Sequence, residues 1–349
     1  MKMNDSMNEL LELCFRQPFH ELKALFDKAY ELSCNNFSNA IHFYVPGMVH
    51  YETAFYQATM PQSFPGISIT GRKCSLNCEH CKGTLLESMI PATTPEKLFE
   101  TCVMIKRAGG RGCLISGGSL SDGSVPLEGF ISVIKRVKQE LGLKVAVHTG
   151  LVQPSLAEAL GEAHIDAAMI DIMGANETIK EVYHLNFSVD SFRRSLTLLS
   201  RNRIPIVPHV VVGIHYGKLR GEKRAVEIIS KCHPAAVVIV ALTPLEDTPM
   251  ETVIAPSPLD IGRVVLASRL LMPHVPLLLG CARPKGMHKV KTDILAIRAG
   301  VNGIAYPSEE ACKLATKVGL KISFHEECCS LLWQDVTLSD TSRVSATVG

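Results

Sequence analysis

Three cysteines stand within eight residues of one another, in the segment Cys74-Ser-Leu-Asn-Cys78-Glu-His-Cys81. Thiolates with this C-x3-C-x2-C spacing can converge on one [4Fe–4S] cluster, and three of them leave one iron without a protein ligand. That open iron is a coordination site for a cofactor or a substrate. A zinc site is the alternative, but structural zinc needs four ligands and His80 is poorly placed to serve the same ion, so a fourth ligand would have to come from elsewhere.

The chain has 12 cysteines in 349 residues, which is unusual for a protein that is neither short nor visibly secreted. Its first fifteen residues include Asp5, Glu9 and Glu12 and no long apolar core, so they do not read as a signal peptide. We therefore expect a cytoplasmic protein with reduced thiols. The net charge of +2 implies no strong electric field, and neither nucleic acid nor a membrane is an expected partner.

The positions of the apolar residues predict an α/β fold. Short apolar, β-branched runs are typical of buried parallel strands, and they lie at 66–70, 113–117, 145–149, 166–172, 206–213, 236–242, 276–281 and 302–306. Helical periodicity alternates with most of them, at 95–108, 127–140, 155–163, 188–202, 222–232, 258–271 and 290–299. Eight strand–helix units predict a closed (β/α)8 TIM-type barrel, with an open doubly wound sheet as the alternative. The three cysteines follow the first strand, at the catalytic face of such a barrel.

Three regions are expected along the chain: an N-terminal helical extension (1–60), the barrel (61–310) and a short C-terminal cysteine-bearing segment (311–349). Residues 7–33 have helical periodicity, and the prolines and glycine within 34–64 predict irregular structure there. A ninth apolar run at 319–324 leads to Cys328 and Cys329, and the polar residues 334–349 predict a frayed end.

The cysteine loop resembles the cluster motif of the radical S-adenosylmethionine (SAM) enzymes. This resemblance implies a [4Fe–4S] cluster held by Cys74, Cys78 and Cys81, with SAM on the open iron. Other segments match weaker features of that family in chain order, and the resemblance implies that they contact SAM. They are His80 before the third cysteine, Gly117, Gly118 and Ser119 after the second strand, Asp171 at the end of the fourth, and Gly213 with Glu222 after the fifth. Ser119 stands where the family often has a glutamate, which removes a carboxylate contact there.

The resemblance implies one-electron chemistry. SAM would bind the open iron through its amino and carboxylate groups, and reductive cleavage would release a 5′-deoxyadenosyl radical that abstracts hydrogen from an unactivated carbon. The cofactors supply this chemistry, while the barrel positions them and excludes water. His148 and His209, on the third and fifth strands, are further candidates for contact with SAM or substrate, or else are histidines satisfied within the core.

The other nine cysteines fall into two groups. Six lie in or near predicted helices or at a strand start and are expected to pack as small apolar residues: Cys14, Cys34, Cys102, Cys113, Cys232 and Cys312. Cys281 ends the seventh strand, and the vicinal pair Cys328-Cys329 follows the last apolar run within a polar segment. These three could meet at the barrel mouth around a second, auxiliary iron–sulfur cluster. The alternative is an ordinary cysteine pair near a chain end.

A second cluster could donate sulfur, as the resemblance to biotin synthases implies. In those enzymes an arginine touches the second cluster, and Arg283 lies in a comparable stretch. However, the third, fourth and fifth strands of this chain contain no cysteine, so the biotin-synthase ligand set is missing.

The longer resemblance is to one member of the two-protein lipoyl synthases of archaea and some bacteria, through Cys78-Glu-His-Cys81, Leu114-Ile-Ser-Gly-Gly118, Leu279-Gly-Cys-Ala-Arg-Pro284 and Cys328-Cys-Ser-Leu331. It implies a sulfurtransferase, a lipoyl synthase component in lipoate biosynthesis. The implied partners are an octanoylated lipoyl-carrier protein or peptide as substrate, a paralogous partner synthase, and a low-potential electron donor such as a ferredoxin or flavodoxin. Two alternatives remain: a radical SAM enzyme with one cluster and another biotin-synthase-like reaction, and a non-enzymatic zinc-binding scaffold.

Overall fold

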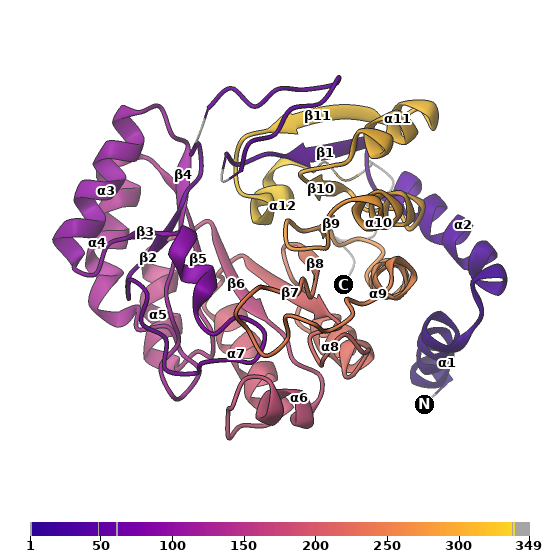
Figure 1. Ribbon diagram of the computed structural model, residues 1–349, viewed down its shortest axis with the longest axis horizontal. Coiled ribbons are helices and arrows are strands. Elements are labelled where there is room, and N and C mark those ends of the chain that lie inside the picture. The colour runs from indigo at the N-terminus through magenta and orange to yellow at the C-terminus, as the bar shows by residue number, and fades with distance from the viewer. Residues whose placement is uncertain (1, 48, 61, 337, 339–349) are drawn as a thin grey trace.

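One curved sheet organises the molecule (Figure 1). The computed structural model describes residues 2–47, 49–60, 62–336 and 338. Within these residues eleven strands form the sheet in the order β11-β1-β10-β9-β8-β7-β6-β5-β4-β2-β3, and every ladder between neighbours is parallel. Parallel strands need helical crossovers, and these cover the outer face of the sheet.

The eight strands predicted from the sequence are all present, with ends that differ by a few residues. The strands of the described chain are β1 (Ala40–Tyr44), β2 (Gly66–Ser68), β3 (Ile90–Pro91), β4 (Gly112–Ser116), β5 (Lys144–His148), β6 (Ala167–Asp171), β7 (Ile206–Val212), β8 (Val237–Ala241), β9 (Leu277–Leu279), β10 (Gly303–Ala305) and β11 (Lys321–His325). The ninth apolar run forms β11.

Helices form in every stretch where the periodicity predicts them. The helices of the described chain are α1 (Lys2–Arg16), α2 (Phe19–Asn36), α3 (Pro95–Arg107), α4 (Ile131–Arg136), α5 (Pro154–Glu162), α6 (Asn176–Glu181), α7 (Val189–Arg201), α8 (Glu222–Ile229), α9 (Pro258–Leu271), α10 (Met287–Arg298), α11 (Glu309–Lys317) and α12 (Leu332–Asp335). Of these, α6, α11 and α12 are present in addition to the predicted ones. Helices α1 and α2 form a further layer outside α9 and α10 (Figure 1). Because it is covered on both sides, α9 is buried from Ile261 to Leu270.

The α/β class with a barrel-type parallel sheet is confirmed, but the sheet is a half-barrel rather than a closed ring of eight strands. Its two ends are β3 and β11, and no ladder joins them within the described residues. Several inner side chains of the middle strands are small or apolar, among them Ala146, Ala167, Val207 and Val238. They form a core separate from the larger one between the sheet and its helices.

The prediction of irregular structure for residues 34–64 is wrong over Ala40–Tyr44. This stretch forms β1, which pairs with β10 on one side and β11 on the other. Ile41, Phe43 and Tyr44 are fully buried. The strands that stabilise β1 come from the far end of the chain, so no local pattern indicates the pairing.

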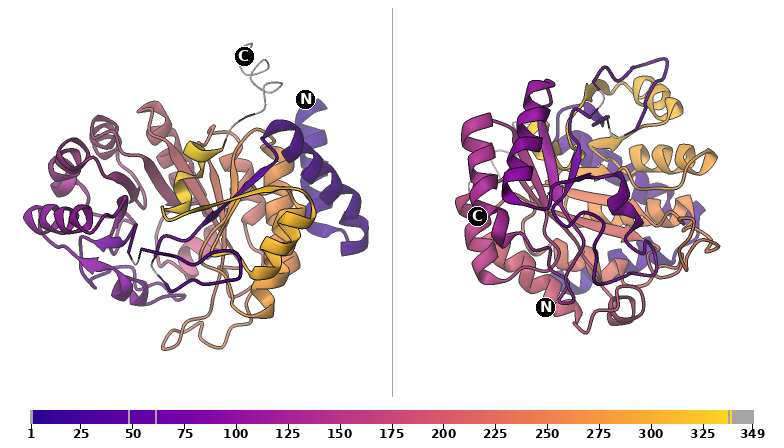
Figure 2. Two further views of the ribbon diagram at one scale, coloured as in Figure 1. Left: turned by 90° about the horizontal axis from the view of Figure 1, so that it is seen from above. Right: turned by 60° about the vertical axis from the view of Figure 1, so that its left-hand side comes forward.

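The C-terminal segment after β11 spans the concave side of the sheet. Glu326 accepts hydrogen bonds from the Tyr56 hydroxyl (2.9 Å) and from the Thr59 backbone N–H (2.8 Å). Glu327 pairs with Lys144 at the start of β5 (2.5 Å). Leu331 and Leu332 then pack against the inner core residues, with α12 inside the curve of the sheet (Figure 2). The segment therefore links the β11 end of the half-barrel to its middle strands.

Most of the residues predicted to form a frayed end lie outside the described part of the chain. Of residues 334–349, position 337 and positions 339–349 are not among the described residues. No helix in the described part of the chain is long and apolar enough to span a bilayer.

Candidate functional site

The loop that carries Cys74, Cys78 and Cys81 leaves β2 and lies directly against the segment that follows β4. Gly118 makes this approach possible, because a Cβ atom there would stand only 2.0 Å from the Lys73 carbonyl oxygen and 2.6 Å from the Cys74 Cα. Two hydrogen bonds join the segments, from the Gly118 N–H to Thr70 Oγ1 (2.7 Å) and from the Ser75 N–H to the Ser119 oxygen (2.8 Å). Gly117, Gly118 and Ser119 therefore fix the position of the cysteine loop.

A second set of contacts fastens the same loop to the segment after α6. The Glu79 N–H donates to the Val182 oxygen (2.9 Å), and the Glu79 carboxylate lies 3.0 Å from His184 Nε2. The other ring nitrogen of His184 lies 3.0 Å from the Leu76 oxygen. Sequence reasoning missed this support, because the partners lie about a hundred positions apart and neither carries a motif.

The three cysteines line a common cavity. Cys78 is buried, while Cys74 and Cys81 are partly exposed toward that cavity. Cys78 shares a side-chain hydrogen bond with Cys81, and this contact lowers the pKa of the Cys81 thiol and raises that of Cys78. The structure therefore brings the predicted triad together.

The cavity has a volume of about 290 Å³ and holds two buried polar atoms that have no partner. One is Nδ1 of His80 and the other is the hydroxyl of Tyr183, whose rings are 5.3 Å apart. Buried polar groups are nearly always hydrogen-bonded, so two such atoms beside the triad indicate a polar ligand. Tyr183 was not predicted, and it has no sequence signal beyond its place after α6.

Three inward-facing polar side chains lie on adjacent middle strands, and two of them end their strands. His148 on β5 and Asp171 on β6 form an ion pair of 3.4 Å, and both line the cavity. Burial opposes ionisation of Asp171, but His148 outweighs it and lowers the carboxyl pKa to about 2. Burial lowers the pKa of His209, on β7, to about 4. The cavity wall thus carries the ionised carboxylate of Asp171, and the neutral imidazole of His209 lies on the next strand.

Gly213 and Glu222 lie together but do not line the triad cavity. The Gly213 N–H donates to Glu222 Oε1 (2.8 Å), and the other carboxyl oxygen of Glu222 is buried without a partner. Burial raises the pKa of Glu222 to about 7. In this structure Glu222 supports the turn after β7, which also carries a positive φ of 71° at Gly213.

The second group of cysteines also converges. Cys281, just beyond β9, lies close enough to Cys328 and Cys329 for each thiol to affect the others electrostatically, and Cys328 and Cys329 share a side-chain hydrogen bond. Cys329 is buried among the inner core residues, whereas Cys281 is exposed. Segments nearly fifty residues apart in the chain therefore supply one cluster of thiols.

Arg283 does not point to this group as a free ligand. Its side chain is fully buried and forms an ion pair with Asp293 (2.8 Å). The remaining guanidinium nitrogens donate to the Gly280 oxygen (2.6 Å) and the Tyr306 oxygen (3.1 Å). These contacts fix the backbone next to Cys281, and Arg283 also lies near enough to Cys281 and Cys329 to favour their thiolate forms. A contact between Arg283 and a second iron–sulfur cluster stays a prediction.

The triad suits a cluster better than a single ion. Within the described residues, no three side chains of His, Cys, Asp or Glu stand close enough together to hold one metal ion. A cluster does not need such closeness, because each iron takes its own thiolate. The thiols, the unpartnered His80 and Tyr183 atoms and the glycine cradle at Gly118 fit a cluster with a polar small molecule beside it.

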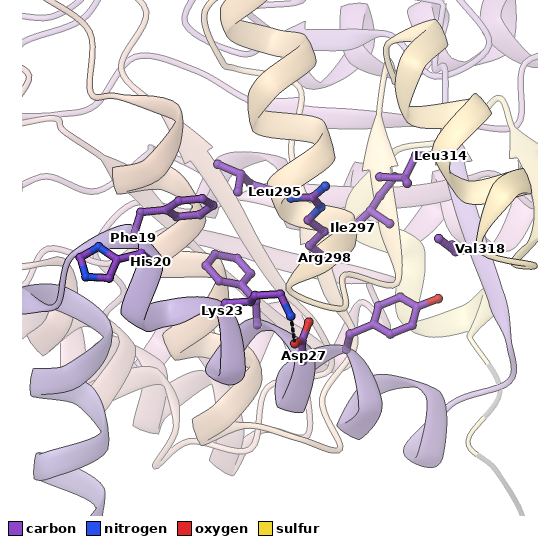
Figure 3. A pocket seen from close by; sticks show the side chains of 11 residues that line it. Phe19, His20, Lys23, Asp27, Leu295, Ile297, Arg298, Leu314 and Val318 are labelled. Atoms are coloured by element: carbon purple, nitrogen blue, oxygen red, sulfur yellow. Dashed lines mark hydrogen bonds and ion pairs between the residues drawn. The ribbon is translucent and has the colours of Figure 1, made fainter.

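A larger cavity, of about 630 Å³, lies between α2, α10 and α11, away from the triad (Figure 3). Its lining is mainly apolar, with Phe19, Leu295 and Leu314 among the side chains drawn. Of its charged groups, Lys23 and Asp27 neutralise each other at 3.1 Å. This cavity contains no cysteine and no convergent set of reactive groups.

Comparison with protein families gives a match over the site-bearing part of the chain. Residues 68–230 match the family described as "Radical SAM superfamily". This range contains the triad, His80, the Gly117–Ser119 segment, Asp171, Gly213 and Glu222. The segment that carries the site is therefore similar to the radical SAM enzymes.

Individual relatives agree with this match. The chain is 28% identical over 217 residues to a protein named biotin synthase from Synechococcus sp. (strain WH7803), covering 58% of this chain and 65% of that protein. It is 28% identical over 251 residues to the biotin synthase of Synechococcus elongatus (strain PCC 7942), covering 69% of this chain and 76% of the relative. The crystal structure of methylornithine synthase (PylB) has the same fold, with a TM-score of 0.62, 16% identity and coverage of 91% and 94% of the two chains.

The contact at Gly118 predicts the effect of one added methyl group. Gly118→Ala should displace the cysteine loop, lower the free energy of unfolding by about 1–3 kcal/mol and remove most cluster-bound iron. Iron analysis after anaerobic reconstitution and urea denaturation measure the two effects. Gly129→Ala is the matched control, because a Cβ there meets nothing within 4 Å. Full iron binding by Gly118→Ala would contradict the proposed contact.

The buried carboxyl of Glu222 predicts a pH-dependent stability. Its pKa is about 7 in the fold against an ordinary 4.5, so ionisation above pH 7 costs about 3 kcal/mol, and this cost disappears as the pH falls toward 4.5. Glu222→Gln should therefore be more stable than the parent protein at pH 8 and similar to it at pH 4.5. Urea midpoints across this range measure the difference. Glu128→Gln, at an exposed carboxylate, should track the parent; a Glu222→Gln difference that does not change with pH would exclude the argument.

Proposed function

We propose that this radical SAM enzyme inserts sulfur into an octanoyl chain held on a lysine of a carrier protein, as a lipoyl synthase component. The observation that carries the proposal is the second cluster of thiols, Cys281, Cys328 and Cys329, on the inner side of the same half-barrel as the triad. An enzyme that only abstracts hydrogen has no need of it. An auxiliary iron–sulfur cluster held there would provide a source of sulfur.

The order of strands supports the placement of a substrate between the two groups of thiols. The triad follows β2 and Cys281 follows β9, so β4 to β8 lie between them in the sheet. Their inner faces change from polar His148 and Asp171 near the triad to apolar Val211 and Val240 nearer Cys281. This gradient suits a polar cofactor at one end and an aliphatic chain at the other.

The roles of the chain's own residues follow from this arrangement. Cys74, Cys78 and Cys81 would hold the first cluster, and the chemistry that it supplies with SAM is one-electron reduction and hydrogen abstraction from an unactivated carbon. The Gly117–Ser119 backbone would bind the amino acid part of the cofactor, and Asp171, held ionised by His148, would accept hydrogen bonds from its polar groups. His80 and Tyr183 each offer one polar atom to the same ligand.

Biotin formation is the second candidate, because the curated relatives at 28% identity are named biotin synthases. Two observations count against it. The inner faces of β5, β6 and β7 carry His148, Asp171 and His209 where cysteines are expected for that reaction, and Arg283 is occupied by Asp293 and two carbonyl oxygens. The lipoyl synthase proposal includes three partners. They are an octanoylated carrier protein, a paralogous partner synthase and a low-potential electron donor.

Iron counting tests the second cluster. After anaerobic reconstitution the parent should bind about eight irons, and Cys281→Ala or Cys328→Ala about four. Cys232→Ala, at a partly buried thiol elsewhere, is the matched control and should bind as much iron as the parent.

Incubation with an octanoyl-lysine peptide, SAM and a reductant, with and without the paralogous synthase, should give a peptide heavier by sulfur, measured by mass spectrometry.

The outcomes separate the candidates. Four irons in both the parent and the Cys281→Ala variant would show that the protein holds no second iron–sulfur cluster. Conversion of dethiobiotin to biotin with no thiolated peptide would favour the biotin-synthase reading, and no sulfur product from either substrate would contradict sulfur insertion.

A further inference from the structure

Two histidines and a serine meet at the β1–β11 edge of the sheet, with His325 three positions before Cys328 in the chain. His42 on β1 faces Ser323 on β11 in register, and His325 follows two positions later on the same face of β11. His42 Nδ1, His325 Nε2 and Ser323 Oγ are 3.0 Å apart in each of the three pairs. Three donor atoms thus form an equilateral triangle.

Hydrogen bonds account for all three sides of this triangle only if one proton is shared. A ring nitrogen of a neutral imidazole is either a donor or an acceptor, so the pair His42–His325 uses one proton and the serine hydroxyl supplies one more. Two protons serve three contacts only if one of them is shared between two acceptors in a bent, three-centre hydrogen bond. A cation that accepts a lone pair from each of the three atoms would replace this shared hydrogen bond.

The dimensions suit a small transition-metal ion. Two ligands about 2.0–2.1 Å from a tetrahedral zinc ion are about 3.3 Å apart, close to the observed 3.0 Å. Imidazole nitrogens are favoured ligands of zinc and its neighbours in the first transition row. Because the third donor is a hydroxyl, two histidines would carry most of the affinity, and water would complete the coordination.

An outer carboxylate orients the His325 ring. Asp335 Oδ2, on α12, lies 3.7 Å from His325 Nδ1 and accepts a hydrogen bond from the Tyr44 hydroxyl at 2.6 Å. At 3.7 Å the carboxylate makes no hydrogen bond to the ring, but its charge favours a proton on Nδ1 and therefore a free lone pair on Nε2. His325 and Asp335 are 22% and 21% exposed, so a cation can reach the site from solvent.

We propose that His42, His325 and Ser323 bind a divalent transition-metal cation, zinc in preference, with Asp335 as the outer carboxylate. The ion would join β1 to β11 and, through Asp335, to α12. Cys328 and Cys329 lie between His325 and Asp335 in the chain, so the ion would also fix the segment that carries these two thiols. The site does not depend on the sulfur-insertion proposal.

Zinc uptake by the cluster-loaded, full-length protein tests this site. After dialysis against a zinc buffer, the parent should retain one more zinc per chain than the double variant His42→Gln/His325→Gln, and zinc should raise the parent's melting temperature but not the variant's. His50→Gln, at an exposed histidine, is the matched control and should behave as the parent. Asp335→Asn should weaken zinc binding about 10–100-fold.

Equal zinc content in the parent and the double variant would overturn the proposal, because zinc held by the cysteines contributes equally to both. Circular dichroism checks that the double variant is folded. If it is not, Asp335→Asn decides the question: unchanged zinc affinity in that variant excludes the site.

Discussion

The backbone of the cysteine loop lies against Gly118 so closely that no side chain fits between them, and the site depends on this contact. A Cβ at this position would reach to 2.0 Å from the Lys73 oxygen. Because two hydrogen bonds hold the loop against the Gly117–Ser119 segment, the triad and the backbone after β4 face one cavity. The bonds from Glu79 to the segment after α6 hold the loop from its other side, which brings His80 next to Tyr183.

Because the half-barrel is not closed, the C-terminal segment can cross its concave side and place two cysteines there. Glu326 and Glu327 fasten this segment to Tyr56, Thr59 and Lys144, and Leu331 and Leu332 bury themselves against the inner faces of the middle strands. As a result Cys328 and Cys329 are held inside the curve of the sheet, near Cys281. The buried Arg283–Asp293 pair performs the corresponding task for Cys281 by holding the Gly280 carbonyl. Polar contacts thus hold both segments that supply these thiols, the one with Cys281 and the one with Cys328 and Cys329.

The strands that carry the site could be predicted from the sequence, because parallel strands buried on both faces read as continuous apolar runs. β1 could not, since Ala40–Tyr44 is short, contains His42 and is stabilised by partners more than 250 positions away. The triad was identified by its spacing alone. Tyr183, His184 and the His42–His325 pair were not, because their roles arise from contacts between distant segments. The contacts of Arg283 with Asp293 and with the Gly280 and Tyr306 oxygens also have no sequence signal.

The central claim is that Cys74, Cys78 and Cys81 hold a cluster that cleaves SAM beside the Gly118 backbone. The most direct measurement is the formation of 5′-deoxyadenosine from SAM by the anaerobically reconstituted protein under a strong reductant. The account predicts steady formation by the parent and by a Cys232→Ala variant, and none above background when Cys74, Cys78 and Cys81 are all replaced by alanine. Equal 5′-deoxyadenosine formation by the triple variant would contradict it.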